Sequence, residues 1–569
     1  MTPTVSDNPL AAQLVPLFAR LDPAAGPELA ALIEQLAAAN QAGHVCLSVA
    51  PPARAARLAA SPLVGRPGDY APLILDAAGR LYFARHWFDE ERLAARLSAL
   101  AGARHEVDAA RLSAVLTRLF PAADPTQPDR QKMAAALAVR QRLVVISGGP
   151  GTGKTTTVVR LLAALAELSP RPLLMAMAAP TGKAAARLTE SVQGASAQLA
   201  LEAPLRRQLP EGAQTLHRLL GLRPGLTTPR HHAGNPLPLD VLVVDEASMI
   251  DLALMAKTLD ALPPHARLIL LGDRDQLASV DPGAVLGELC RQVCYRPDTL
   301  DWLAAACGPL PDGLATTPHA LADSVVLLTH SHRFAADSGI GALARAVNAG
   351  DAAGALAVLD DEAYPDVGWQ PGDLAEGLWQ ARQDYFAAVA AGAAPDQLQR
   401  EFNRFMVLAA ERRQVDACNR AIEARLEAAG RKSPERDGYP GRPLMITEND
   451  YGIGLFNGDI GFTVQRADGL RVAFPTTDGG WRDIAPGRLP AHQTVFAMTV
   501  HKSQGSEFER VWLALPETAS AILNRALVYT AITRARRVFA VQGRAEVWTA
   551  AVELAPERAS GLADRLAGV

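Results

Sequence analysis

The chain has 569 residues, of which 49% are hydrophobic and 20% are charged, and its formal net charge is −4. This length excludes a single hydrophobic core and predicts roughly three or four domains. The composition is ordinary for a globular protein, and no apolar run reaches the roughly 20 residues that a membrane-spanning helix needs.

The net charge and the cysteines bear on partners and compartment. Slight acidity argues against a surface that is basic throughout, but one basic groove is enough to hold DNA. The first ten residues lack a basic segment followed by an apolar stretch, so we expect no export signal and a cytoplasmic protein. The cysteines are few, odd in number and scattered, which fits free thiols in a reducing compartment. They are Cys46, Cys290, Cys294, Cys307 and Cys418.

Three of these cysteines are close enough in sequence to suggest zinc or a metal cluster. The spacing of Cys290, Cys294 and Cys307 is not of the CxxC type, and no fourth ligand lies nearby. We therefore expect thiols of the core or of loops there.

Lysine is rare in this chain, with six lysines among 56 basic residues. A sequence that uses arginine almost everywhere is expected to keep lysine where a compact ammonium group is needed. Three of the six, Lys154, Lys183 and Lys502, fall inside the P-loop and the motifs Ia and V described below.

Residues 1–119 are expected to form a helical N-terminal domain. Alanine, leucine and arginine recur at helical spacing in Leu93–Leu100 and Ala109–Leu119, and the segment has no lysine and no recognisable chemistry. A docking or structural role is favoured. The three prolines of Phe120–Asp129 predict a linker.

Residues 120–330 alternate short apolar runs with helical segments. Nearly continuous apolar runs are typical of a parallel sheet covered on both faces, and such sheets bind ligands at the carboxyl ends of their strands. The expected strands are Leu143–Gly148, Leu173–Pro180, Val241–Glu246 and Arg267–Asp273.

Residues 331–569 predict a second α/β region. Within it, the stretch at about 441–490 is rich in glycine, proline and aspartate and contains short strand-like pieces. We expect a small β insertion there, of SH3-like or barrel form.

The sequence GGPGTGKT follows the first expected strand and precedes a helical segment. It matches the P-loop pattern GxxxxGK[ST], in which backbone N–H groups surround phosphate oxygens at a helix N-terminus. Lys154 is expected to reach the β- and γ-phosphates, and the Thr155 hydroxyl to hold Mg²⁺. The nucleotide-binding candidates are Gly148, Gly149, Pro150, Gly151, Thr152, Gly153, Lys154, Thr155 and Thr156.

Two carboxylates, Asp245 and Glu246, end the expected strand VLVVDE. Without other motifs, such a pair is a solvated strand end about as often as it is a functional site. Behind a P-loop, Asp245 is expected to complete the Mg²⁺ shell and Glu246 to polarise the attacking water. The sequence therefore predicts nucleotide hydrolysis.

An ordered series of further motifs resembles the superfamily 1 helicases. The resemblance gives Gln131 of DRQKMAA the role of reading adenine. It makes APTGKAAARL and QTLHRLLG motifs Ia and Ib, which lie near the DNA strand. LGDRDQLASVDPGAVLGEL matches motif III, whose Gln276 senses the γ-phosphate. The DNA-contact candidates of this half are Pro180, Thr181, Lys183, Thr215 and His217.

The second half completes the series. LTHSHRFAADSGIGALA resembles motif IV and LVYTAITRARR resembles motif VI, which gives Arg333 and Arg534 the roles of arginine fingers. Such arginines stabilise charge on the transferred phosphoryl group. MTVHKSQGSEFERVWL resembles motif V, whose residues face DNA or the nucleotide cleft. Its candidates are Thr499, His501, Lys502, Ser503 and Gln504.

Longer strings, HHAGNPLPLDVLVVDEASMIDL among them, resemble the RecD family beyond the generic helicase pattern. The resemblance covers most of residues 131–537. It implies an α/β fold with two tandem RecA-like P-loop cores, ATP and Mg²⁺ as cofactors, and a 5′→3′ motor on single-stranded DNA in double-strand break repair and recombination. It also implies RecB-like and RecC-like partner subunits, with the N-terminal domain docking on the RecC-like one.

Several alternatives stay open. A P-loop switch protein would need one α/β core and no motif V, so the second half disfavours it. A nuclease would need a separate carboxylate cluster with a lysine, which does not stand out, so DNA cleavage is assigned to a partner subunit. A stand-alone RecD-like helicase would carry helix-hairpin-helix repeats before Gln131, and no such pattern is seen. An RNA helicase of the same superfamily is a further alternative, and the residues alone do not give the direction of movement.

Overall fold

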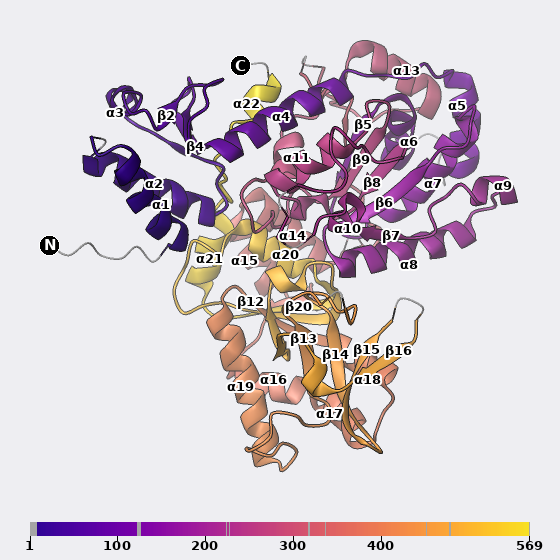
Figure 1. Cartoon of the computed structure of the whole chain (residues 1–569). Helices are drawn as coiled ribbons and strands as arrows, with labels where there is room; N and C mark the ends of the chain where they lie inside the picture. The colour runs from indigo at the N-terminus through magenta and orange to yellow at the C-terminus, as the bar shows by residue number, and fades with distance from the viewer. Residues whose placement is uncertain are drawn as a thin grey trace.

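The computed structural model describes residues 8–567 except 25, 122–126, 224, 227, 317–318, 336, 451 and 477–478. Two parallel sheets form the centres of two α/β lobes, and two smaller sheets are attached to them (Figure 1). The middle of the predicted linker, Phe120–Asp129, lies outside the described residues. In the described part of the chain, no helix combines the length and the apolar character needed to cross a bilayer.

The first lobe is built on six parallel strands in the order β10-β5-β9-β8-β6-β7. All four predicted strands are confirmed, and β5 and β8 are buried along their whole length, as expected for a sheet covered on both faces. β5 pairs with both β9 and β10, so the loop that follows it is flanked by the carboxyl ends of two neighbouring strands. The strands are β5 (Leu143–Gly148), β6 (Met175–Ala179), β7 (Ala213–Thr215), β8 (Val241–Val244), β9 (Arg267–Gly272) and β10 (Val325–Leu328).

Helices cover both faces of this sheet with apolar side chains. One face packs against α5, α6, α7 and α13, and the other against α4, α10, α11 and α22. The helices are α4 (Ala84–Ala101), α5 (Ala109–Leu119), α6 (Arg130–Arg140), α7 (Lys154–Leu168), α8 (Gly182–Gln198), α9 (Ala203–Arg206), α10 (Leu216–Leu220), α11 (Leu252–Ala261), α12 (Val285–Leu289), α13 (Pro297–Cys307) and α22 (Leu562–Ala567).

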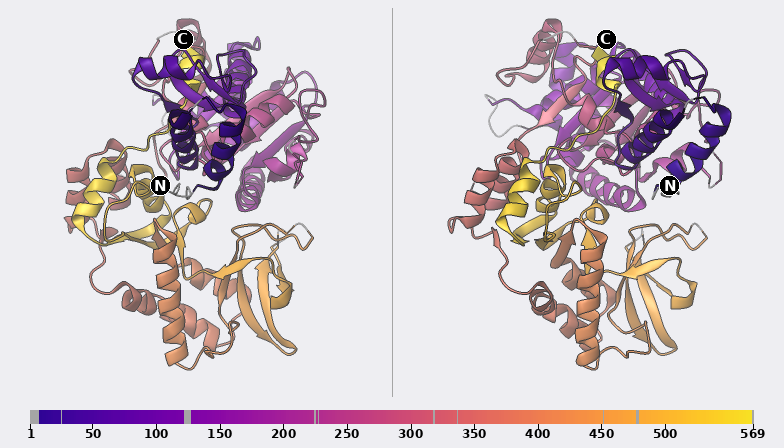
Figure 2. Two further views of the ribbon diagram at one scale, coloured as in Figure 1. Left: turned by 60° about the vertical axis from the view of Figure 1, so that its left-hand side comes forward. Right: turned by 90° about the vertical axis from the view of Figure 1, so that its left-hand side faces the viewer.

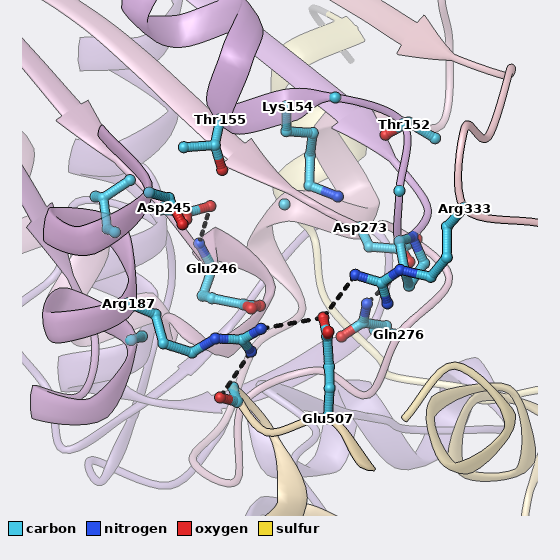
Figure 3. A pocket seen from close by; sticks show the side chains of 18 of the residues that line it. Thr152, Lys154, Thr155, Arg187, Asp245, Glu246, Asp273, Gln276, Arg333 and Glu507 are labelled. Carbon is cyan, nitrogen blue, oxygen red and sulfur yellow. Dashed lines mark hydrogen bonds and ion pairs between the residues drawn. The ribbon is translucent and has the colours of Figure 1, made fainter. Parts of the chain in front are cut away.

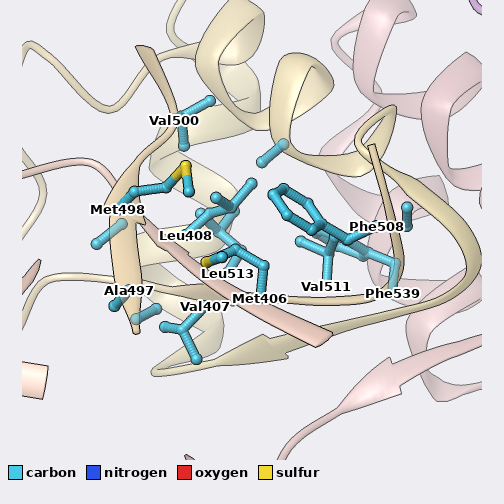
Figure 4. Close-up of a cluster of buried hydrophobic side chains, with 14 of the residues drawn as sticks. Met406, Val407, Leu408, Ala497, Met498, Val500, Phe508, Val511, Leu513 and Phe539 are labelled. Atoms are coloured by element: carbon cyan, nitrogen blue, oxygen red, sulfur yellow. The ribbon is translucent and has the colours of Figure 1, made fainter. Parts of the chain in front are cut away.

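The second lobe has five parallel strands in the order β11-β20-β19-β12-β18. The central strands β12 and β19 bury aliphatic side chains against the helices that cover them (Figure 4). The strands are β11 (Val367–Trp369), β12 (Phe405–Ala409), β18 (Ala497–Thr499), β19 (Phe508–Ala514) and β20 (Ala535–Gln542). The helices are α14 (Gly339–Ala349), α15 (Ala352–Asp360), α16 (Leu374–Ala381), α17 (Gln383–Ala390), α18 (Pro395–Asn403), α19 (Arg412–Ala428), α20 (Arg525–Ile532) and α21 (Ala545–Glu553).

The β insertion predicted at about 441–490 is a five-stranded antiparallel sheet in the order β16-β15-β14-β13-β17. It starts two residues after the predicted boundary and ends four residues beyond it, and its SH3-like form stays a prediction. The strands are β13 (Pro443–Ile446), β14 (Ile460–Arg466), β15 (Gly469–Pro475), β16 (Trp481–Ile484) and β17 (His492–Thr494).

The prediction of a helical N-terminal domain is incomplete, because this region also holds a four-stranded sheet in the order β1-β4-β3-β2. Its strands have two to four residues, too few for a period of two to stand out in the sequence. In addition, α5 packs in the apolar cluster of the first lobe, although the proposed boundary at residue 119 assigns it to the N-terminal domain. The elements are α1 (Pro9–Leu21), α2 (Gly26–Gln41), α3 (Pro52–Leu58), β1 (Cys46–Ser48), β2 (Val64–Gly65), β3 (Leu73–Leu75) and β4 (Arg80–Phe83).

Residues 555–567, here called the C-terminal segment, leave the second lobe after α21 and return to the N-terminal region (Figure 2). The Ala559 carbonyl accepts from the Val45 N–H at 2.8 Å. The fully buried Glu90 of α4 accepts from the Ser560 hydroxyl at 2.6 Å and from the Gly561 N–H at 2.7 Å. The sequence assigned these residues to the second core, but the apolar side of α22 packs against α4 and α12 instead.

A candidate nucleotide site between the lobes

A cavity of about 290 Å³ lies between the two lobes, and all six residues predicted to act in catalysis line it (Figure 3). Of the other nucleotide-binding candidates, Gln131, Gly148 and Gly149 do not contribute to its wall. The lining residues are Pro150, Gly151, Thr152, Gly153, Lys154, Thr155, Thr156, Ala184, Arg187, Leu188, Ser191, Asp245, Glu246, Gly272, Asp273, Gln276, Arg333, Gly505, Glu507 and Arg534.

The P-loop connects β5 to α7 and forms one wall of the cavity. Gly151 and Gly153 have φ angles of 75° and 80°, which L side chains rarely adopt. A Cβ on Gly151 would also lie 2.3 Å from the Cβ of Arg333. The Lys154 ammonium donates to the carbonyls of Gly148 at 2.5 Å and Gly149 at 3.1 Å, so it lies over the loop. This cradle of backbone and ammonium fits a chain of phosphates.

The side chain of Gln131, at the start of α6, lies behind the P-loop. Its amide nitrogen donates to the Thr152 carbonyl at 3.0 Å, and a Cβ on Gly153 would lie 2.4 Å from the same nitrogen. In this structure the Gln131 side chain therefore supports the P-loop. Its expected role in reading the adenine of the nucleotide stays a prediction.

The two carboxylates after β8 face the P-loop. Asp245 accepts from the Glu246 N–H at 2.9 Å, and burial, together with the charge of Glu246, raises the pKa of Asp245 to about 6. Glu246 has a φ of 51°, in the left-handed region that strains a non-glycine backbone. Oxygen donors such as Asp245 and Thr155 suit Mg²⁺, which keeps most of its shell for water and phosphate. Among the described residues, no group of three or more His, Cys, Asp or Glu side chains is placed to hold a metal ion.

Arg333 lies in the loop after β10, which rests on the P-loop. The His332 N–H donates to the Gly151 carbonyl at 2.8 Å, and the Ser331 hydroxyl donates to the Pro150 carbonyl at 3.0 Å. The predicted boundary at 330 gives Arg333 to the second core, but these bonds fix its backbone to the first. Its Nη1 is buried and has no hydrogen-bond partner among the described residues, as expected of a group that receives an anion.

Arg534 reaches the cavity from the second lobe and is 4% exposed. Its Nη2 donates to the Gln276 side-chain oxygen at 3.0 Å, and the Gln276 amide donates to Asp273 at 3.0 Å. The Tyr529 hydroxyl donates to the same Asp273 carboxylate at 2.9 Å. Burial lowers the pKa of Arg534 and raises that of Asp273. Motif III of the first lobe is thus bonded directly to the motif VI helix of the second.

Sequence reasoning missed Arg187 and Glu507. Arg187 lies on α8 one turn after Lys183, and that i, i+4 spacing of basic residues was available as a signal. Glu507 lies inside the motif V string MTVHKSQGSEFERVWL, but the site residues expected there end at Gln504. Burial alone would raise the pKa of Glu507, but the surrounding arginines outweigh it and hold the pKa at about 2.

The DNA-contact candidates of the first lobe lie outside the cavity. The hydroxyls of Thr181 and Thr215 accept from backbone N–H groups and cap α8 and α10, and Pro180 precedes the first of these caps. Lys183 donates to the Ser506 hydroxyl across the lobes at 2.5 Å, and burial lowers its pKa to about 8. His217 is an exposed residue of α10, and partial desolvation lowers its pKa.

The candidates of the second lobe cluster around the short helix η3 (His501–Ser503). The Thr499 hydroxyl accepts from the Lys502 N–H at 3.3 Å, and the Lys502 ammonium donates to Asn457 of the β insertion at 2.7 Å. Burial lowers the pKa of His501, and the nearby Arg558 of the C-terminal segment lowers it further. These side chains are therefore held by neighbouring residues of the chain.

Two family models match the chain, an AAA domain at residues 131–282 and a UvrD-like helicase C-terminal domain at residues 494–539. The RecBCD enzyme subunit RecD of Mycolicibacterium smegmatis is 41% identical over 91% of this chain and 87% of that protein. The ATP-dependent RecD2 DNA helicase of Deinococcus radiodurans is 33% identical over 75% of this chain and 50% of that protein. A Bacteroides Pif1 structure bound to single-stranded DNA gives a TM-score of 0.40 at 17% identity, over 75% of this chain and 94% of that one.

Proposed function

This chain belongs to the RecD family of DNA helicases, and from that premise we propose that it is an ATP-driven 5′→3′ motor on single-stranded DNA. We propose further that it works in the cytoplasm as one subunit of a RecBCD-type complex in double-strand break repair and recombination. Relatives named as RecBCD subunits support this assembly, since they align over most of their length.

The bond between Arg534 and Gln276 is the observation that carries the proposal. It joins the two lobes at the wall of one cavity, next to the P-loop lysine. A nucleotide bound there would contact both lobes, so loss of its terminal phosphate changes how the lobes hold one another. This is the property that separates a motor from a P-loop switch with one core.

The chain's own residues account for the chemistry of hydrolysis. Lys154 binds phosphate oxygens, and Glu246 orients and polarises the attacking water. Arg333 and Arg534 stabilise negative charge on the phosphoryl group from two sides. Thr155 and Asp245 would hold Mg²⁺, which when bound neutralises charge on the phosphates.

Movement along DNA requires two grips whose strength alternates. We place one grip on the first lobe near Lys183 and His217, and the other on the second lobe near Thr499 and His501. Lys183 is bonded to Ser506 of motif V, so a shift of the second lobe changes the surroundings of Lys183 directly. Contacts to DNA phosphates and base stacking would make binding tolerant of sequence and sensitive to salt.

The partners follow from the family. The N-terminal domain is the proposed docking surface for a RecC-like subunit, and DNA cleavage is assigned to a RecB-like subunit.

The test is co-purification with RecB-like and RecC-like subunits, followed by unwinding of duplexes with 5′ or 3′ single-stranded tails. We expect a ternary complex, ATP hydrolysis stimulated more by single-stranded DNA than by RNA, and, for this motor alone, unwinding of the 5′-tailed duplex. Degradation of DNA by the isolated chain with Mg²⁺ would contradict the assignment of cleavage. Full activity without partners would favour a stand-alone helicase.

A further inference from the structure

Glu507 is surrounded by three arginines from three different segments. One of its oxygens, Oε1, accepts a hydrogen bond from Arg333 Nη2 at 2.8 Å and forms an ion pair with Arg187 Nη2 of α8 at 3.1 Å. The other oxygen, Oε2, accepts from Arg536 Nε of β20 at 2.9 Å. In Figure 3, Arg187 and Arg333 reach Glu507 from opposite sides.

The two oxygens face different surroundings. Arg187 and Arg333 line the nucleotide cavity together with Glu507, whereas Arg536 does not line it and its side chain is 56% exposed. The Glu507 side chain itself is only 11% exposed. Oε1 is therefore an anionic oxygen held by two guanidinium groups inside the cavity.

The charged side chains that line the cavity balance one another. Among the described lining residues, four cations (Lys154, Arg187, Arg333 and Arg534) are matched by four carboxylates (Asp245, Glu246, Asp273 and Glu507). Asp245 and Glu246 have roles at the cation and the water, and Asp273 is bonded to Gln276 and Tyr529. Glu507 is the lining carboxylate whose cavity-side oxygen is bonded to arginines of the cavity.

A phosphate oxygen competes for the same donors. Guanidinium groups bind phosphate and carboxylate in the same geometry, and a terminal phosphate carries more charge than one carboxylate. Arg333 also has its buried Nη1 without a partner in the described structure. If Oε1 leaves, Oε2 keeps Arg536 as a partner outside the cavity, so the displaced carboxylate is not left without a counter-charge.

We propose that Arg187 is a third phosphate-binding arginine, and that the Glu507 carboxylate occupies its place until the terminal phosphate of ATP displaces it. The proposal rests on the nucleotide site described above. In this exchange, ATP must displace the Glu507 carboxylate from Arg187 and Arg333 in order to bind, whereas ADP does not. ADP lacks the phosphate that makes this exchange, so its affinity is independent of Glu507.

The test compares equilibrium affinities of the full chain for a fluorescent ADP and for a β,γ-imido analogue of ATP. Glu507→Gln should bind the analogue several-fold more tightly than the wild type, with ADP affinity unchanged. Arg187→Gln should weaken the analogue, and by more in the Glu507→Gln background, where no carboxylate has to be displaced. There the loss should be about 10- to 100-fold, the range for a lost charge-assisted hydrogen bond.

Arg536→Gln removes the partner that the displaced carboxylate keeps outside the cavity, so it should lower the ratio of analogue to ADP affinity by about twofold or more, the effect of one typical hydrogen bond. Arg537→Gln is the control, because it removes an exposed arginine of the same strand, and it should leave this ratio unchanged. Weaker analogue binding by Glu507→Gln would overturn the exchange and identify Glu507 as a clamp between the lobes. An unchanged ratio in Arg187→Gln in both backgrounds would overturn the role of Arg187. Failure of the wild type to bind either nucleotide would instead reject the proposed function, and retained ADP binding shows that each variant is folded.

Discussion

The guanidinium of Arg534 donates a hydrogen bond to the side-chain oxygen of Gln276 at 3.0 Å, joining the two lobes where they enclose the P-loop. Neither group is solvated, since Arg534 is 4% and Gln276 is 8% exposed. A buried, charge-assisted bond of this kind depends strongly on the exact approach of the two lobes. It therefore gives motif III a direct connection to the second lobe.

Lys154→Gln should abolish DNA-stimulated ATP hydrolysis and leave the fold intact. The amide keeps a hydrogen-bond donor for the carbonyls of Gly148 and Gly149 but brings no charge to the phosphates. Phosphate release with and without single-stranded DNA measures the effect, and circular dichroism checks the fold. Turnover retained in a folded variant would mean that the phosphate site is misidentified.

Arg534→Ala should slow hydrolysis by about 10²–10³-fold with a smaller loss of ATP affinity, because its charge acts on the transition state. Single-turnover hydrolysis and nucleotide binding measure the two effects separately. Arg537→Ala removes an exposed arginine of β20, the strand that follows Arg534, and should change neither. Loss of binding with an unchanged hydrolysis rate would contradict the finger role.

Thr530→Val should uncouple the lobes without touching the cavity. The Thr530 hydroxyl accepts from the Leu277 N–H of motif III at 2.9 Å, and both residues are buried. Valine leaves this N–H without a partner in the closed arrangement, at a cost of about 1–3 kcal/mol. We expect DNA stimulation of hydrolysis to fall by about tenfold or more, measured as the ratio of rates with and without DNA.

The matched control for this change is Thr533→Val, one turn further along the chain. The Thr533 hydroxyl is also buried, but it donates to the Thr530 carbonyl within the same lobe, at 3.0 Å. This variant should lose thermal stability while keeping DNA stimulation. Equal loss of stimulation in both variants would show that the effect is one of general stability.

Glu288→Gln should remove a pH-dependent loss of stability. Burial in α12 raises the pKa of Glu288 from 4.5 to about 7, and the charge of the neighbouring Glu90 raises it as well. Hydrogen bonds from Ser560 and Ala563 and the charge of Arg291 act in the opposite direction but are outweighed. Because the folded pKa lies above the unfolded one, stability is full below about pH 4.5 and is lost as pH rises to about 7. The loss is at most roughly 3 kcal/mol.

The measurement is the free energy of unfolding at pH 5 and at pH 8. Glu288→Gln should be the more stable protein at pH 8, and the difference should shrink toward pH 5. Glu557→Gln, the same change at an exposed position of the C-terminal segment, should follow the wild type at both values. A Glu288→Gln curve parallel to the wild type would reject a shifted carboxyl at this place.

The sequence predicted the local motifs of the site and much of the fold. Strands such as Leu143–Gly148 were predictable because a sheet buried on both faces leaves a continuous apolar run. The cavity residues Lys154 and Asp245 were predictable because phosphate and metal chemistry fixes their spacing from glycines and strand ends.

What the sequence did not reveal depends on contacts between distant segments. Arg187 and Glu507 meet across 320 positions of the chain (507 − 187), and neither carries a local signal for the other. The strands of the N-terminal sheet are too short to show a period, and the docking of α22 depends on the apolar surface of α4. Such features follow from tertiary packing rather than from local pattern.

The return of the C-terminal segment restricts the motion that hydrolysis can drive. A body joined to another at one point can turn about any axis through that point, but one joined at two points can turn freely only about the line between them. The second lobe leaves the first at the loop before α14 and is joined again to the N-terminal region through Ala559 and to α4 and α12 through α22. The second lobe should therefore rotate about the single axis that joins its two attachment points, and each hydrolysis cycle should repeat the same rotation.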